Sequence, residues 1–292
     1  MLRAIFLVIV LISSLIWGQA ALPDTDIFLV KISNDQGKIA FGDAINITQR
    51  SGYDSQPSFL PDGASLLYTS IREDGQADIY RYDLASKTTT RVTSTVESEY
   101  SPMVMADGKS FSVVRVEADG TTQRLWQFPL AGGVPSLILE KVTAVGYYAW
   151  GDAKTLALFI VGEPHTLQIA QLPESTVKLM ADNIGRALHK IPGKNAISFV
   201  HKITETNWLV KQVDLGTEAI SDIIPTLPGS EDCTWTPDGK LWMGNQGKLY
   251  QYDPSVDQEW HVIADFSNTE MKQFGRLAVN QQGDVLAIVA VK

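Results

Sequence analysis

A set of polar residues stands just before short apolar runs that recur along the chain. Carboxylates, guanidinium groups and tyrosines that converge on one rim are what recognition of another molecule requires. The carboxylates alone would also suit a cation such as Ca²⁺, which takes several carboxylate oxygens as ligands. The members of this set are Asp54, Gln56, Glu97, Glu99, Tyr148, Arg186, His189, Glu231, Asp232 and Arg276.

No sequence signature of catalysis accompanies these residues. The chain has no Gly-x-Ser-x-Gly elbow, no Gly-x-Gly-x-x-Gly loop, no phosphate-binding loop and no His-Glu-x-x-His pair. The 4 histidines lie in different parts of the chain without metal-ligand spacing. Cys233, the single cysteine, adjoins no basic residue and is expected to be a small buried side chain. The sequence therefore assigns no catalytic residue and no metal ligand.

The elements that must position the polar set are repeated. Gln56 to Gly63 (QPSFLPDG) precedes the apolar run 66–70, and the pattern returns at 101–108 and at 235–239, with weaker copies at 150–152, 191–193 and 279–283. The turn glycines at 63, 108, 193, 239 and 283 are separated by 45, 85, 46 and 44 residues, and 85 is two repeats. A period of this size is typical of propeller blades.

Each repeat carries further alternating segments. Polar and apolar residues alternate over 78–84, 124–128, 166–170, 208–213 and 248–252, which predicts half-buried antiparallel strands. Shorter segments of strand-forming residues follow at 90–93, 136–139, 177–180 and 260–263. Each repeat is thus expected to form four strands, and the polar set then falls in the loops that lead into the first strand of each. In that arrangement the carboxylates should gather on one side of the rim and the bases on the other. The carboxylates are Asp54, Glu97, Glu99, Glu231 and Asp232, and the bases are Arg186, Lys272 and Arg276.

The two ends of the chain complement each other. Segments 26–32 and 45–48 match the outer strands of a repeat, whereas 276–280 and 285–291 match the inner ones. We therefore predict an all-β, six-bladed β-propeller of four-stranded antiparallel blades, in which the N- and C-terminal strands share and close the last blade. A two-sheet sandwich is the alternative, but it explains neither the period nor the complementary ends.

The repeats resemble those of the TolB-type propeller family, which is WD-repeat-like. The resemblance rests on Pro57, Phe59, the turn 61–63, Tyr68-Thr69-Ser70 and Asp78-Ile79-Tyr80, with partial copies at 102–108 and 235–239. It implies a β-propeller, and members of the family often work in envelope complexes. The α/β domain that precedes the TolB propeller has no counterpart here, so the resemblance implies a stand-alone propeller.

The N-terminal residues have the three parts of a secretory signal. Arg3 precedes the apolar run 4–17, and small residues at 18 and 20 suit a signal peptidase. We expect a signal peptide over 1–20 and one domain over 21–292, in the periplasm or secreted, without a transmembrane segment in the mature chain. The formal net charge of −9 disfavours a nucleic-acid partner, because phosphate contacts need lysine and arginine.

Three functions remain open. The leading hypothesis is a non-catalytic, monomeric scaffold that binds a protein or peptide of the cell envelope through the rim. The second is a metal-dependent hydrolase or lactonase with carboxylates around a central cation. The third is a channel that binds a glycan or small molecule, where Tyr147 and Tyr148 could stack on sugar rings.

Overall fold

The computed structural model describes residues 22–35, 38–173 and 176–292, and every regular element in them is a β-strand. The predicted all-β organisation is therefore confirmed for this part of the chain. Within it, no helix has the length and apolarity needed to cross a membrane. The predicted signal peptide, residues 1–20, lies outside the described residues.

Four of the sheets each contain four antiparallel strands in chain order. The first comprises β7 (Ser98–Val104), β8 (Ser110–Val116), β9 (Gln123–Pro129) and β10 (Ser136–Leu137). The second comprises β11 (Val145–Trp150), β12 (Thr155–Ile160), β13 (Thr166–Gln171) and β14 (Thr176–Asp182). The third comprises β15 (Ile184–Lys190), β16 (Ala196–Lys202), β17 (Trp208–Asp214) and β18 (Ile220–Pro225). The fourth comprises β19 (Cys233–Trp235), β20 (Leu241–Asn245), β21 (Lys248–Tyr252) and β22 (His261–Asp265).

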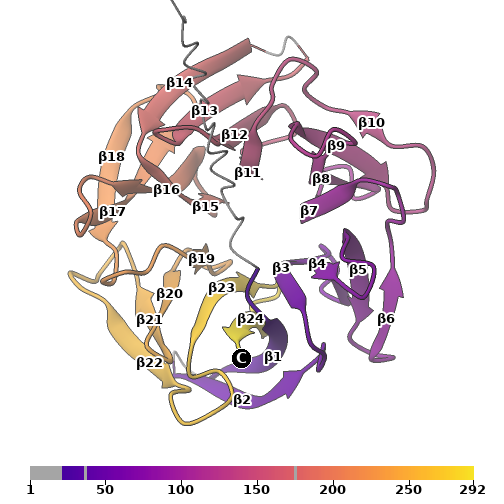
Figure 1. Ribbon diagram of the computed structural model, residues 1–292. Coiled ribbons are helices and arrows are strands. Elements are labelled where there is room, and N and C mark those ends of the chain that lie inside the picture. The colour runs from indigo at the N-terminus through magenta and orange to yellow at the C-terminus, as the bar shows by residue number, and fades with distance from the viewer. Residues whose placement is uncertain (1–21, 36–37, 174–175) are drawn as a thin grey trace, which may run out of the picture.

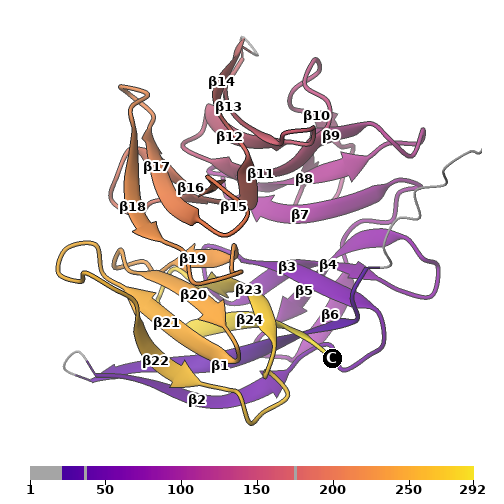
Figure 2. The ribbon, with the colours of Figure 1, turned by 60° about the vertical axis from the view of Figure 1, so that its left-hand side comes forward.

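The remaining eight strands form one sheet with two halves. One half contains β3 (Tyr53–Phe59), β4 (Ser65–Ile71), β5 (Ala77–Asp83) and β6 (Thr88–Arg91). The other contains β23 (Phe274–Val279), β24 (Val285–Val291), β1 (Thr25–Asp35) and β2 (Lys38–Asn46). A single parallel pair, Thr25 with Tyr53, joins the halves. The strands β3, β7, β11, β15, β19 and β23 lie innermost around a common axis (Figures 1 and 2).

The burial of each strand follows its distance from that axis. The second strands are buried on both faces because each sheet packs between two others; in β4, six consecutive residues are buried. The outermost strands are exposed, as in β6, where all four residues are. Polar contacts cross between neighbouring sheets as well: Ser112 Oγ on β8 accepts hydrogen bonds from Tyr148 Oη (2.8 Å) and Trp150 Nε1 (2.9 Å) on β11.

The Asp-Gly turns join the first and second strands, as their sequence predicts. Gly63 and Gly108 have φ values of 68° and 61°, which only glycine adopts without a steric penalty. Asp62 Oδ1 accepts a hydrogen bond from the Ala64 amide at 2.9 Å, and Asp107 Oδ1 accepts one from the Lys109 amide at 2.8 Å. These residues shape the turns.

The two ends of the described chain pair with each other. β1 runs antiparallel to β24 from Thr25–Val291 to Lys31–Val285, and the central five residues of β24 are buried. Lys292 Nζ lies 3.0 Å from Asp24 Oδ1 and 3.1 Å from Asp26 Oδ1. The outer strand β2 ends at residue 46, whereas the sequence placed it at 45–48. A bulge between Val30 and Ile32 of β1 shifts the register of that pair.

Candidate functional site

A cavity of about 280 Å³ lies on the axis, lined by residues of the innermost strands of all the sheets. Its polar lining residues are Gln56, Ser58, Ser101, Tyr147, Tyr148, Arg186, His189, Asp232, Thr234, Arg276 and Gln281. Six of the ten residues predicted as a rim are among them. The other four, Asp54, Glu97, Glu99 and Glu231, do not line the cavity.

The segments predicted as loops belong mostly to strands. Tyr53 to Gln56, Ser98 to Tyr100 and Arg186 to His189 lie within β3, β7 and β15. In β3, β7 and β15 the register shifts part-way along the strand. A bulge of this kind interrupts the alternation of polar and apolar side chains along the strand. The polar residues of these segments therefore lack the pattern of a strand and were predicted as loops.

The expected separation of charge, acids on one side and bases on the other, is wrong. Arg186 Nε and Nη2 donate to Asp232 Oδ1 and Oδ2 at 2.9 and 2.5 Å, a two-pronged contact between neighbouring sheets. Glu231 Oε1 lies 3.6 Å from Arg186 Nε, and its Oε2 lies 2.9 Å from Lys202 Nζ. Opposite charges attract most strongly where water is excluded, so the acids and bases pair instead of segregating.

Two glycines make room for these carboxylates. A Cβ on Gly185 would lie 2.7 Å from Glu231 Oε2, and one on Gly275 would lie 2.9 Å from Asp232 Oδ2. Any side chain at either position would displace a carboxylate. Burial raises the pKa of Asp232, but the guanidinium groups of Arg186 and Arg276 lower it further, so that the net pKa lies below the usual value.

Arg276 has a different partner. Its Nη2 donates to Tyr147 Oη at 3.0 Å, and its guanidinium carbon lies 4.9 Å from the centre of the Tyr147 ring. Tyr147 in turn packs edge-on against Phe159 of β12, with ring centres 5.5 Å apart. Arg276 and Tyr147 are 129 positions apart in the chain, so no local sequence pattern predicts their contact.

Tyr148 and Gln56 serve mainly to join neighbouring sheets. Tyr148 is 3% exposed, and its hydroxyl oxygen lies 3.0 Å from the Ser101 carbonyl oxygen as well as 2.8 Å from Ser112 Oγ. Gln56 Oε1 accepts from Thr69 Oγ1 at 2.7 Å and from the Ser101 amide at 2.8 Å. Tyr148 therefore presents no free ring face for stacking on a sugar.

His189 lies on β15 and lines the cavity beside Asp232 and Cys233. Burial lowers its pKa from 6.5 to about 4, so the imidazole is neutral at pH 7. Cys233 is 3% exposed, and burial raises its thiol pKa to about 12. The thiol is thus the buried side chain that the sequence predicts, and it is a weak nucleophile at neutral pH.

The lowered pKa of His189 predicts a loss of stability in acid. The unfolded chain takes up the proton below pH 6.5, whereas the folded chain resists it until about pH 4. Between these values the free energy of unfolding of the wild type should fall relative to His189→Asn, by up to about 1.4 kcal/mol per pH unit. Urea denaturation at several pH values measures this. The exposed His261→Asn serves as the control, and equal pH profiles for wild type and His189→Asn would contradict the assignment.

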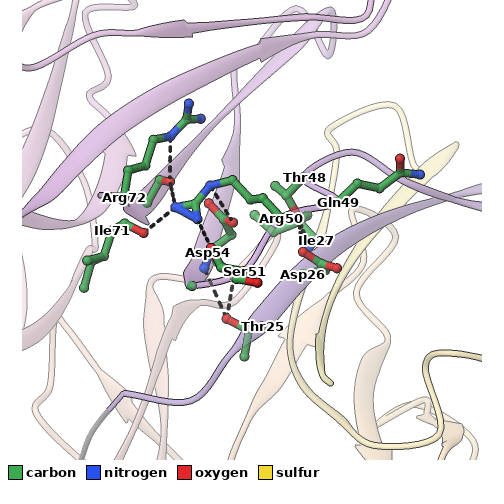
Figure 3. Close-up of polar contacts among 12 residues, drawn as sticks. Thr25, Asp26, Ile27, Thr48, Gln49, Arg50, Ser51, Asp54, Ile71 and Arg72 are labelled. Atoms are coloured by element: carbon green, nitrogen blue, oxygen red, sulfur yellow. Dashed lines mark hydrogen bonds and ion pairs between the residues drawn. The ribbon is translucent and has the colours of Figure 1, made fainter. Parts of the chain in front are cut away.

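Asp54 lies in the interior and not on a rim. It is 0% exposed, with Oδ2 3.5 Å from Arg50 Nε, and neither carboxylate oxygen has a hydrogen-bond partner among the described residues. Arg50 is held by the carbonyls of Ser51 and Ile71 (Figure 3). Burial raises the pKa of Asp54. This carboxylate faces Arg50 close to the pair that joins β1 and β3, so its role is in the packing of the two halves of the sheet.

Glu99 is also interior, and Glu97 lies close to it. Arg115 Nε on β8 lies 3.1 Å from Glu99 Oε1, and its Nη2 lies 3.4 Å from Glu97 Oε2. Glu99 is 0% and Arg115 6% exposed, and the guanidinium lies 4.6 Å from the centre of the Trp126 ring. Burial raises the pKa of Glu99. Arg115 is the partner that sequence reasoning missed, because it sits within an apolar run.

The described residues bring no three histidine, cysteine, aspartate or glutamate side chains together as metal ligands. The carboxylates predicted to surround a cation are instead engaged by arginine or lysine. The donor set on the axis, with Asp232 already bound to Arg186, does not fit a Ca²⁺ site, which needs several carboxylate oxygens.

Comparison with known proteins identifies the fold through solved structures, whereas sequence comparison identifies no family. No protein-family profile matches the chain, and no curated protein matches it in sequence. Among solved structures, a candidate TolB from Agrobacterium tumefaciens superposes with a TM-score of 0.68 at 15% identity, over 93% of this chain and 99% of that one. TolB from Acinetobacter baumannii gives 0.59 at 15% identity, over 92% of this chain and 64% of that one.

An oligogalacturonate lyase in complex with manganese is about as similar to this chain as TolB from Acinetobacter baumannii is. Its TM-score is 0.59 at 14% identity, over 87% of this chain and 83% of that one. At such low identity a structural likeness establishes the fold and not the chemistry. The chain has the β-propeller fold of TolB-type proteins.

Proposed function

We propose that residues 21–292 form one six-bladed propeller, closed by its two ends, and that it is an exported, non-catalytic protein that binds a protein or peptide of the cell envelope. The blade count rests on dividing the eight-stranded sheet at its single parallel pair, Thr25 with Tyr53. Closure rests on the pairing of β1 with β24. Export to the periplasm or outside the cell rests on the signal-like pattern of residues 1–20.

The observation that carries the binding proposal is the axial cavity. Every inner strand contributes to it, and it combines charged, aromatic and amide side chains. We define the inner-strand face as the segments that lead into these strands, which include 92–97, 226–232 and 266–273. Val96 on this face is 86% exposed, and Lys272 is exposed as well. An exposed apolar side chain beside charged groups suits a protein partner.

Crosslinking in intact cells of the source organism, followed by affinity purification, tests this proposal. The test variant is Val96→Asp with Lys272→Glu on the inner-strand face. The matched control is Val134→Asp with Lys109→Glu, an equally exposed valine and an exposed lysine elsewhere. We expect the test variant to lose partners that the wild type and the control retain. Identical recovery by all three would refute binding through this face.

The lyase likeness keeps a metal-dependent enzyme as the second candidate, and thermal melting separates the two. A ligand that binds only the native state raises the melting temperature. Because the described donors do not form a cation site, we expect Mn²⁺, Ca²⁺ and chelator each to leave the melting temperature unchanged. A rise of several degrees with either ion would favour the enzyme hypothesis over the scaffold.

A further inference from the structure

The axial cavity carries a positive charge in an acidic protein. Its charged lining residues are Arg186, Arg276 and Asp232, and His189 is neutral at pH 7. The chain as a whole has a formal net charge of −9. A cavity whose charge is opposite to that of the whole molecule attracts an anion in preference to a cation.

The charge of Arg186 is already balanced. Its guanidinium donates to both oxygens of Asp232, and Glu231 is shared between Arg186 and Lys202. These four side chains contain two positive and two negative charges and are neutral together. Arg276 also acts on Asp232 electrostatically but forms no ion pair with it among the described residues, and it is the source of the excess charge in the cavity.

Arg276 has no carboxylate within ion-pair distance among the described residues. Its only side-chain hydrogen bond among them is the one to the neutral hydroxyl of Tyr147. A guanidinium has five N–H donors, so most of them are available to a ligand. The Tyr147 ring beneath it restricts the movement of the guanidinium without neutralising its charge. Arg276 is thus held in place without a carboxylate partner in the part of the chain that the structure describes.

The geometry points to a carboxylate of a bound peptide as the counter-ion of Arg276 in the axial cavity, which builds on the proposed peptide-binding function. A carboxylate accepts two parallel hydrogen bonds from one guanidinium, and the amide of Gln56 and the Tyr147 hydroxyl line the same cavity. A cavity of about 280 Å³ lies at the small end of ligand sites, which suits one inserted side chain or chain end.

Ligand-observed NMR with short peptides tests this inference. The probes are acetyl-Gly-Glu-Gly-amide, its glutamine counterpart, and acetyl-Gly-Gly with a free C-terminal carboxylate; galacturonate represents an acidic sugar. We expect the glutamate peptide or the free C-terminal acid to bind roughly tenfold more tightly than the glutamine peptide, with affinity that falls as salt rises. Which of the two binds identifies the source of the carboxylate.

The variants assign the effect to Arg276. Arg276→Gln should weaken binding roughly tenfold, and Arg276→Lys, which keeps the charge but loses the two-pronged contact, should fall between it and the wild type. Arg81→Gln is the matched control, because Arg81 also donates to a neutral hydroxyl, that of Ser65 at 2.9 Å, but lies on β5 outside the cavity. Melting curves check that each variant is folded.

Four outcomes overturn the inference: equal binding of the glutamate and glutamine peptides, no binding of any peptide at millimolar concentration, unchanged binding by folded Arg276→Gln, or binding of galacturonate alone. The crosslinking experiment is independent of these. If Val96→Asp with Lys272→Glu loses partners while Arg276→Gln leaves peptide binding unchanged, the proposed function stands and the carboxylate site is refuted. The reverse pattern leaves a carboxylate site without a protein partner.

Discussion

Arg115→Met is expected to lower the free energy of unfolding by roughly 3–5 kcal/mol at neutral pH, because it leaves Glu99 as an uncompensated buried charge. Glu99 is 0% exposed, and its Oε1 lies 3.1 Å from Arg115 Nε. Methionine can still fill the space beside Trp126 and Phe128. The decrease in the free energy of unfolding therefore comes mainly from the lost charge and not from lost packing. Urea denaturation followed by far-ultraviolet circular dichroism measures the difference.

The sign of the pH dependence separates this mechanism from a packing defect. Burial already raises the folded pKa of Glu99 above its unfolded value, and loss of Arg115 raises it further. The penalty on the variant is therefore present at neutral pH and shrinks as the pH falls and Glu99 takes up a proton. Glu99→Gln with Arg115→Met should recover much of the stability, since no charge remains buried. A deficit that stays constant with pH and persists in the double variant would refute the charge mechanism.

Ile288→Ala should lower the free energy of unfolding by about 2–5 kcal/mol, whereas Ile288→Val should cost about 0.5–1.5 kcal/mol. Ile288 is 0% exposed at the centre of β24, opposite Phe28 on one side and Leu277 on the other. Loss of its side chain weakens the seam where the two ends of the chain meet. Urea denaturation of the three proteins measures the series.

Hydrogen exchange tests whether that seam holds the whole ring. If the ring is closed and cooperative, Ile288→Ala will reduce amide protection in β11 to β14, across the axis from β24, as much as in β1 (Figure 1). Leu158→Ala, in the middle of β12 and also 0% exposed, gives the matched comparison from the far side. Loss of protection confined to β1, β2, β23 and β24 would mean that the terminal sheet opens by itself and that closure contributes little to stability.

Local patterns accounted for most of the strands. Val285 to Val291 was expected as a strand and is β24 to the residue, and 248–252 is β21. Period-two alternation is a property of a few consecutive residues, and an Asp-Gly turn involves only four residues. Both features can therefore be predicted from a short stretch of sequence. The likeness of the two ends to complementary parts of a repeat likewise predicted that β1 and β24 would meet.

The candidate site depended on distances that no local pattern contains. Six of the ten polar residues line the cavity, yet the expected charge separation failed, because Arg186 pairs with Asp232, 46 residues away. Asp54 and Glu99 occupy the interior beside Arg50 and Arg115, and neither lines the cavity.

The sequence by itself determined that this chain is a repeated all-β protein with Asp-Gly turns and matching ends, because backbone preference and alternation act over a few residues. Only the tertiary structure decided which charges are cancelled and which are left. Tyr147 and Arg276 are 129 residues apart and meet because their strands line the same axis. Burial and pairing in three dimensions fix the electrostatics of a site, and those depend on the neighbours that the fold supplies.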